Sequence, residues 1–239
     1  MCETGAMGVR QDSRARMEAQ IVEVGRRHLI TDGAAGLSLR GIARDLGVVS
    51  SAVYRYVSSR DDLLTLLLVD AYSELADVVD RAAAADDTGW RERIVRMAHA
   101  AREWAVSQPA RWALLYGSPV PGYRAPAERT TGPGTRMVGS FFRAVAAGIA
   151  AGDLSDDEGV VPEGLSTDFG QLREQFGFAA GDAAVAKTIT LWAGLIGAIS
   201  LEVFGQYGSD TFSDPRAVFD LHAGALVDLL TVNPADARN

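Results

Sequence analysis

The chain has little of what most enzymes and secreted proteins need. Its 239 residues include a single cysteine, Cys2, which excludes an internal disulfide framework and any zinc site built on paired thiolates. Only three histidines are present, His28, His99 and His222, and they do not have metal-ligand spacing. No glycine-rich phosphate loop and no Gly-x-Ser-x-Gly elbow occurs in the sequence. We therefore expect no metal, no cofactor and no catalytic residues.

Long apolar runs are also scarce. The longest nearly uncharged run, Ile189 to Leu201, is too short to cross a membrane and is followed at once by Glu202. The first eleven residues lack the apolar core of a secretory signal. With 48% apolar and 23% charged residues, the composition is that of a folded globular protein with a sizeable core. The expected location is the cytoplasm, without a membrane partner.

Negative charge dominates the chain as a whole but not its beginning. The net charge is −8, whereas residues 1–60 carry nine arginines against six acidic residues. The first sixty residues are therefore net positive, and the rest of the chain is strongly acidic. Because binding to phosphates follows the local field rather than the total charge, the N-terminal segment can bind nucleic acid.

Apolar residues recur at helical spacing through nearly the whole sequence, and there is no alternating strand pattern or internal repeat. Five of the eight prolines fall between Pro109 and Pro133, which predicts a long loop over residues 117–135. The predicted helix caps are Ser38, Ser58 or Ser59, Asp182 and Asp214. The pattern predicts an all-α fold with helices over 14–30, 39–46, 50–57, 60–85, 90–108, 110–116, 136–151, 168–176, 183–207 and 215–230.

Two of these helices, 39–46 and 50–57, are short and are joined by a tight turn at Gly47, which is the arrangement of a helix-turn-helix. The residues that the second helix can present to DNA are small or polar, which suits a helix lying in a groove: Ser50, Ser51, Ala52 and Arg55. On spacing alone, an αα-hairpin that only packs into a core is the alternative.

The segment Leu37 to Leu64 resembles the DNA-binding domain of the TetR family of bacterial regulators. The family pattern is matched by Ser38, Ile42-Ala43, Gly47-Val48, Tyr54, Tyr56, Arg60 and Leu63-Leu64. Val49 stands where the family often has the serine that caps the recognition helix, so Ser50 is expected to cap instead. Val57 replaces the usual phenylalanine, and Arg60 replaces the usual lysine. The resemblance implies a flexible N-terminal arm (1–13), a helix-turn-helix DNA-binding domain (14–59) and a helical effector-binding and dimerisation domain (60–239).

The resemblance also implies which residues contact a double-stranded DNA operator. Phosphate contacts are assigned to Ser38, Tyr54, Tyr56 and Arg60, whose hydroxyl and guanidinium groups suit phosphate oxygens. Base-edge contacts are assigned to Arg40, Ser50, Ser51 and Arg55, and the fork of Arg40 fits the O6 and N7 atoms of guanine. The structural alternatives are that Tyr54 is a core residue and that Arg40 and Arg55 are solvated surface residues.

The C-terminal part resembles a TetR-type effector domain, of the subgroup named for its Trp-His-Gly element, over Trp104–Pro109, Leu114–Gly117 and Trp192–Gly205. Ile196 stands in place of the histidine of that element. Apolar side chains around the predicted loop suit a site for a small molecule, although each is alternatively a core residue. The candidates are Trp104, Trp112, Tyr116, Met137, Phe141 and Trp192, and the nearest polar groups are His99 and Arg102.

The last two long helices predict a homodimer. The helix over 183–207 is apolar nearly all round and carries Gly194 and Gly197, where another helix can approach closely. Together with the amphipathic helix over 215–230, it predicts a four-helix seam between two copies, and completion of one monomer's core is the alternative. The expected function is a ligand-responsive repressor, released from a palindromic operator by a small apolar or amphipathic effector. A helical enzyme or a protein-binding adaptor without DNA binding is the rival hypothesis.

Overall fold

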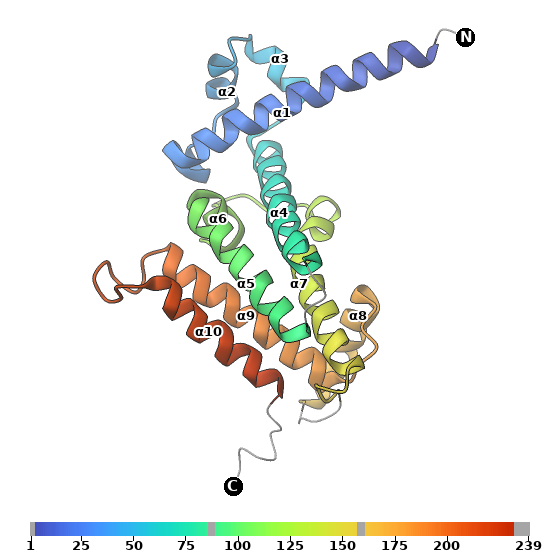
Figure 1. Cartoon of the computed structure of the whole chain (residues 1–239). Coiled ribbons are helices and arrows are strands. Elements are labelled where there is room, and N and C mark those ends of the chain that lie inside the picture. The colour runs from blue at the N-terminus through green and yellow to red at the C-terminus, as the bar shows by residue number, and fades with distance from the viewer. Residues whose placement is uncertain (1–2, 86–88, 157–160, 232–239) are drawn as a thin grey trace. The chain divides into compact units, whose positions relative to one another are not determined.

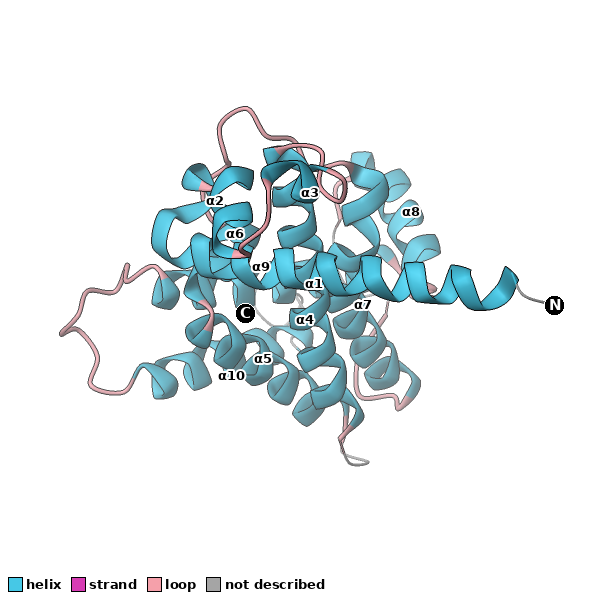
Figure 2. Cartoon of the chain, turned by 90° about the horizontal axis from the view of Figure 1, so that it is seen from above, coloured by secondary structure: helices cyan, strands magenta, loops and turns pink. Residues whose placement is uncertain are grey.

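The computed structural model describes residues 3–85, 89–156 and 161–231. Within these ranges the chain forms ten α-helices and one 3-10 turn and contains no strand (Figure 2), so the all-α prediction is confirmed. The described residues belong to two compact units. The first unit comprises Met1–Ser73 with Ala110–Gly134, and the second comprises Glu74–Pro109 with Thr135–Asn239.

The first unit contains the helix-turn-helix and a later part of the chain packed onto it. It is built from α1 (Glu3–Gly36), α2 (Leu39–Asp45), α3 (Ser50–Tyr54), the first half of α4 (Arg60–Ala84), α6 (Pro109–Tyr116) and the first turns of α7 (Ala127–Ala150) (Figure 1). One apolar core joins α1, α2, α3, α4 and α6, and its fully buried members are Ile21, Ile42, Val53, Val57, Leu63 and Leu64.

The second unit contains the remainder of α4 and α7, together with α5 (Trp90–Ser107), the 3-10 turn η1 (Glu163–Leu165), α8 (Ser166–Phe176), α9 (Asp182–Val203) and α10 (Pro215–Thr231). Helices α5, α9 and α10 lie side by side (Figure 1). Large apolar residues fill the space between the helices of this unit: Ile94, Met97, Phe141, Phe142, Leu195 and Phe219.

Several predicted helix boundaries are wrong. Residues 3–13, predicted as a flexible arm, belong to α1, because extending an existing helix costs much less than starting one. Helix α7 begins at Ala127 rather than at residue 136 and carries Pro133 inside it, so the predicted loop is shorter than expected. Helix α3 ends at Tyr54 instead of residue 57, and α9 ends at Val203 instead of residue 207. Residues 157–160, between the predicted helices over 136–151 and 168–176, lie outside the described residues.

Most of the predicted helix caps are confirmed. The Ser38 hydroxyl accepts a hydrogen bond from the Gly41 amide, and the Ser59 hydroxyl accepts one from the Asp62 amide. The Asp214 carboxylate accepts from two amides in the first turn of α10. Asp182 does not cap α9, because Gly181 occupies that position. Its carboxylate accepts hydrogen bonds from Ser166 and Arg173 instead, which lowers its pKa.

Candidate functional site

The candidate DNA-binding face lies on α2 and α3 of the first unit. The opposite side of this motif is buried, because Ile42 of α2 and Val53 and Val57 of the α3 region are closed off from solvent. The tight turn at Gly47 has a left-handed backbone (φ +67°), which explains the glycine at this position. The buried apolar side of the motif thus holds the short helix α3 in place, and the polar side of α3 faces the solvent.

The base-edge candidates lie on this solvent side. Arg40, Ser51 and Arg55 are exposed, and Ser50 is half-buried. Val49 occupies the N-cap position of α3 without a side-chain cap, and Ser50 is the first helical residue. The expectation that Ser50 caps the helix is therefore wrong. Both serines lie in the first turn of α3, the part of a recognition helix that contacts base edges.

The two tyrosines assigned to phosphates flank the end of α3. Tyr54 is 47% exposed, which agrees with a surface role rather than with the core alternative. Tyr56 is half-buried, and the guanidinium carbon of Arg14 lies 6.0 Å from its ring centroid. Arg14 therefore lies beside a predicted phosphate contact, a position that the sequence pattern did not reveal.

The other two phosphate candidates have structural roles as well. The Ser38 hydroxyl is engaged as the N-cap of α2. Arg60 donates from Nη2 to the carbonyl oxygens of Ala34 (2.9 Å) and Ala35 (3.2 Å) at the end of α1. Since cations stabilise the last carbonyls of a helix, Arg60 helps to fix α1 against α4.

A buried histidine joins α1 to α2. His28 is only 8% exposed, and its Nε2 lies 2.6 Å from the Oδ2 of Asp45. This hydrogen bond is the main reason that the pKa of Asp45 lies below its ordinary value. A Cβ atom at position 41 would lie 3.1 Å from the His28 ring, so the glycine there keeps space for the ring. The pair stabilises the helix-turn-helix from behind its exposed face.

Asp70 on α4 joins three helices of the first unit. Its carboxylate accepts two hydrogen bonds from Arg26 of α1 (2.6 and 2.9 Å) and one from the buried Arg111 of α6 (3.0 Å). Arg111 lies outside the expected DNA-binding domain (14–59), yet residues 110–134 belong to the same compact unit. The unit that carries the helix-turn-helix is therefore larger than the sequence predicts.

The six effector candidates are divided between the two units. Trp112 and Tyr116 belong to the first unit, where their rings contact each other with centroids 4.4 Å apart, and burial raises the pKa of Tyr116. The second unit holds Trp104 and Trp192, together with Met137 and Phe141 on successive turns of α7. The indole of Trp104 donates to Glu74 (3.0 Å). All of these side chains except Trp192 and Tyr116, which are half-buried, are buried.

The two polar effector candidates are engaged in packing. Arg102 forms two hydrogen bonds with Glu202 of α9 (2.5 and 2.7 Å) and lies over the ring of Phe219. His99 pairs with Asp220 of α10 (3.0 Å). Both residues therefore hold α5 against the last two helices.

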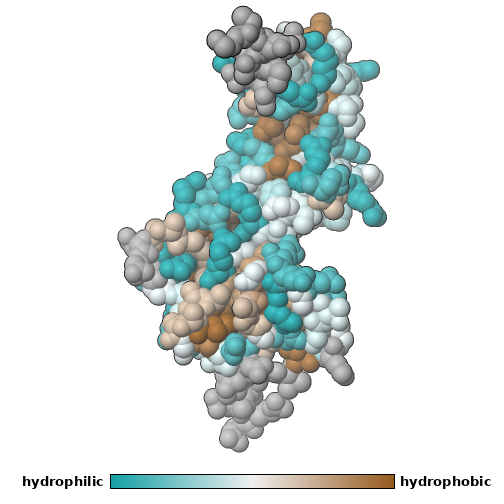
Figure 3. Space-filling model, turned by 90° about the vertical axis from the view of Figure 1, so that its right-hand side faces the viewer, coloured by the Kyte–Doolittle hydropathy of each residue, from teal (hydrophilic) through white to brown (hydrophobic). Residues whose placement is uncertain are grey.

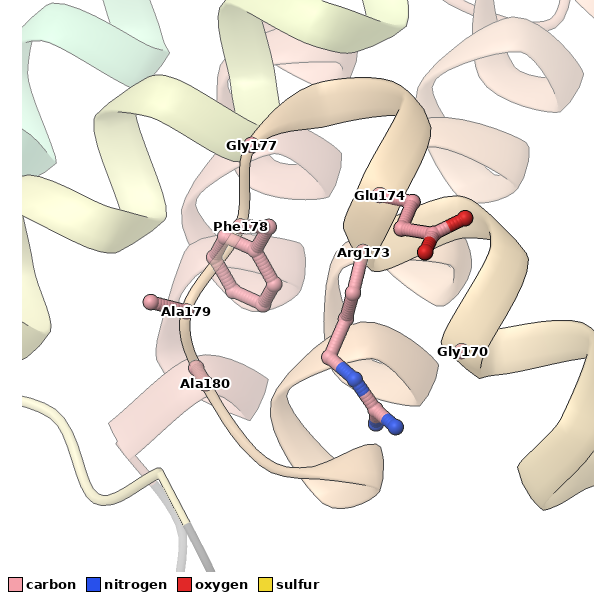
Figure 4. A pocket seen from close by; sticks show the side chains of 7 residues that line it. All are labelled: Gly170, Arg173, Glu174, Gly177, Phe178, Ala179 and Ala180. Carbon is pink, nitrogen blue, oxygen red and sulfur yellow. The ribbon is translucent and has the colours of Figure 1, made fainter.

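A hollow of about 500 Å³ lies between α8 and the segment that leads into α9 (Figure 4). Arg173 extends across it from α8, with Phe178 on the other side. Because Arg173 is paired with Asp182, its charge is already neutralised there. None of the six effector candidates lines this hollow.

Helices α9 and α10 carry two apolar stripes that no other described element covers. On α9 the exposed positions Ala193, Gly197 and Leu201 recur at helical spacing, and on α10 Leu221, Ala225 and Leu229 do the same. Leu221 is 71% exposed and Leu229 is 49% exposed. A groove between the two helices is lined almost entirely by apolar atoms and also includes His222. The side of the molecule drawn in Figure 3 shows hydrophilic surface interrupted by several apolar patches.

Among the described residues, α9 is also the one helix long and apolar enough to cross a membrane by length and composition. Helices α5, α8 and α10 pack against it and leave the stripe of Ala193, Gly197 and Leu201 exposed.

A helix-turn-helix with a buried apolar back and an exposed face of arginine, serine and tyrosine defines a DNA-binding protein. A family model described as "Tetracyclin repressor-like, C-terminal domain" matches residues 94–226. The HTH-type transcriptional regulator Rv1816 of Mycobacterium tuberculosis (strain ATCC 25618 / H37Rv) is 60% identical over 233 residues, which are 96% of this chain and 99% of the relative. The chain belongs to the TetR family and is a DNA-binding transcriptional regulator, not an enzyme.

Solved structures agree with this assignment. The regulatory protein SCO4313 is 32% identical, with a TM-score of 0.74 over 91% of this chain and 98% of that chain. FadR from Bacillus subtilis, solved in complex with stearoyl-CoA, shares the fold at 12% identity, with a TM-score of 0.62 over 90% of this chain and 98% of that one. The DNA-binding prediction is confirmed, and the enzyme and adaptor hypotheses are set aside.

Proposed function

We propose that the protein is a cytoplasmic, homodimeric repressor that leaves a palindromic operator when a small apolar or amphipathic effector binds. The observation that carries the DNA-binding part is the exposed set Arg40, Ser51, Tyr54 and Arg55 on a motif fixed from behind by Val53 and Val57. Arg40, Ser50, Ser51 and Arg55 would contact base edges, and Ser38, Tyr54, Tyr56 and Arg60 would contact phosphates.

The dimer would form through α9 and α10. The two apolar stripes on these helices leave an unpartnered face, and a twofold axis would bring the same face of a second copy onto it. Gly197 has open space around its Cβ position, whereas a Cβ at Gly194 would lie 2.5 Å from Leu226 of the same chain. Gly194 therefore serves packing within the chain, and Gly197 is free for the close approach of a second copy.

The effector would bind among the aromatic residues of the second unit. Trp104, Met137, Phe141 and Trp192 are the candidates there, and Trp112 and Tyr116 are candidates on the DNA-binding side of the chain. FadR, which shares this fold, is solved with stearoyl-CoA, an amphipathic molecule of the proposed class. Residues 14–59 would read DNA, and residues 60–239 would bind the effector and the second copy, with the segment 110–134 attached to the DNA-binding unit.

The test is a selection of duplexes from a random DNA library with the purified full-length protein. The proposal predicts enrichment of one motif with dyad symmetry. Apolar and amphipathic compounds that raise the melting temperature of the protein should also release the selected duplex, because the two binding equilibria are linked. Enrichment of no motif would contradict the operator-binding role.

A further inference from the structure

The start of α7 is tied to the turn that follows the recognition helix. Arg129, on the first turn of α7, donates from Nη1 to the Oδ1 of Asp62 on α4 at 2.5 Å. The other oxygen of the same carboxylate, Oδ2, accepts from the amide (3.1 Å) and the hydroxyl (3.4 Å) of Ser58. One carboxylate therefore joins two segments that are about seventy residues apart in sequence.

Ser58 is well placed to control the DNA-binding face. It follows directly after Val57, which is fully buried, and Tyr54 and Tyr56 lie within four residues of it. The turn that contains it has little helical bonding of its own, because α3 ends at Tyr54. The bond from Ser58 to Asp62 thus adds to the Ser59 cap at the place where this turn ends and α4 begins.

Asp62 is charged when it makes these contacts. Burial raises its pKa, but the hydrogen bonds from Arg129 and Ser58 outweigh that effect and leave the pKa below its ordinary value. Its neighbour Asp61 faces a different cation, Arg60, at 3.8 Å. The carboxylate of Asp62 is therefore available as an acceptor for both partners at neutral pH.

Further contacts attach the same segment to the first unit. The hydroxyl groups of Tyr123 and Thr65 lie 2.9 Å apart, so one donates to the other. The side chains of Leu114, Val120 and Tyr123 pack against the core that contains Val53 and Val57. The segment 110–134 is thus a structural support of the recognition helix rather than a free loop.

Helix α7 has a weak point just beyond Arg129. Pro133 lacks the amide that would bond to the carbonyl of Arg129, and it lies between Gly132 and Gly134. The boundary between the two compact units falls at the same place, after Gly134. Met137 and Phe141, two of the effector candidates, follow on the next turns. Arg129 therefore lies on the first-unit side of this break, and these two effector candidates lie beyond it.

We propose that Arg129 is a positioning residue for operator binding: through Asp62 it holds the turn that follows the recognition helix, and so makes the start of α7 part of the support of the DNA-binding face. The proposal rests on the operator-binding role described above. Arg129 acts directly on the turn at Ser58, because both residues bind the same carboxylate, that of Asp62 in the first turn of α4.

The test compares Arg129→Gln with Arg124→Gln in the full-length protein. Arg124 is an exposed arginine of the same segment, and it makes no ion pair within the described part of the chain, so both variants lose the same charge. The probes are the duplex selected by the wild-type protein and a scrambled duplex. We expect Arg129→Gln to weaken binding of the selected duplex about threefold per protomer, or about tenfold for a dimer, the size of an exposed ion pair. Arg124→Gln should change it less than twofold, and both variants should bind the scrambled duplex alike.

Two further measurements separate positioning from general destabilisation. Hydrogen exchange of residues 55–58 should become faster in Arg129→Gln and not in Arg124→Gln. In an Asp62→Asn background, Arg129→Gln should have little additional effect, because both changes break the same contact. Equal losses in the two arginine variants, or losses that multiply in the double variant, would overturn the positioning role. Failure of the wild-type protein to select any duplex would overturn the operator-binding role itself.

Discussion

Replacing Gly197 with glutamate should convert the protein to monomers without unfolding it. The Cβ position of Gly197 has no neighbour within 4 Å, so a larger side chain meets no obstacle within the chain. Glutamate also favours a helix more than glycine does, by roughly 0.5–1 kcal/mol, so the helix itself is not weakened. The expected damage is therefore confined to the seam between two copies.

The loss of dimerisation free energy in Gly197→Glu follows from the twofold symmetry of the seam. A twofold seam contains position 197 twice, so two carboxylates lose water when the dimer forms. At about 2–3 kcal/mol for each buried polar group without a partner, the dimer loses about 5 kcal/mol, or roughly three to four powers of ten in its dissociation constant. Light scattering at micromolar concentration should then report the mass of one chain instead of two.

Two other glycines provide the controls. Gly132→Glu adds the same charge at an exposed helical position with open space, on α7, and should leave the dimer intact. Gly194→Ala should displace the side chain of Leu226 within the same chain, because its Cβ would meet Leu226 at 2.5 Å, and it adds no charge to the face between two copies. If Gly197→Glu remains a dimer at low micromolar concentration, the seam lies elsewhere and the argument from the two apolar stripes is wrong.

Three other predictions concern the DNA-binding face, the effector and pH. Arg40→Ala should relax base preference at one symmetric pair of operator positions, by about 1–3 kcal/mol, without lowering the melting temperature. Arg60→Ala should lower both the melting temperature and the affinity for every sequence, because it also loses its bonds to Ala34 and Ala35. Binding profiles over single-base operator variants would contradict this if Arg40→Ala lowers all affinities alike. Effector binding should change tryptophan fluorescence and weaken operator binding together, and a tight ligand that leaves operator affinity unchanged would refute the coupling. Because the hydrogen bonds from Arg129 and Ser58 hold the folded pKa of Asp62 below its ordinary value of 3.8, the stabilisation from Asp62 should be complete above that pH and be lost as the pH falls through the folded pKa. Acid unfolding of Asp62→Asn should lack this component, and identical acid transitions for the two proteins would contradict it.

Local signals in the sequence were sufficient to predict the two short helices and their turn, whereas the resemblance to the TetR family distinguished a helix-turn-helix from an αα-hairpin that only packs. Ser38 marks the start of α2, Gly47 permits the left-handed turn, and Ser59 marks the start of α4, and each acts within four residues of its own position. Such signals do not depend on the rest of the fold, which is why they could be read without it.

The attachment of residues 110–134 to the DNA-binding unit could not be predicted in this way. It depends on pairs that are far apart in sequence, such as Arg111 with Asp70 and Arg129 with Asp62, and neither pair leaves a local pattern. The predicted loop over 117–135 was too long for a related reason. Pro133 is tolerated inside α7 although it removes one backbone hydrogen bond. The structural role of Arg60 was hidden because a resemblance assigns a function to a residue but does not show its neighbours.

The central claim is that two copies of this chain present two α2–α3 motifs to one operator, and footprinting of the selected duplex tests it most directly. The account predicts two protected half-sites related by a dyad, with centres about one helical turn of DNA apart or a multiple of it, and loss of both when Gly197→Glu prevents dimerisation. A single protected half-site, or full protection of both half-sites by a monomeric variant, would contradict it.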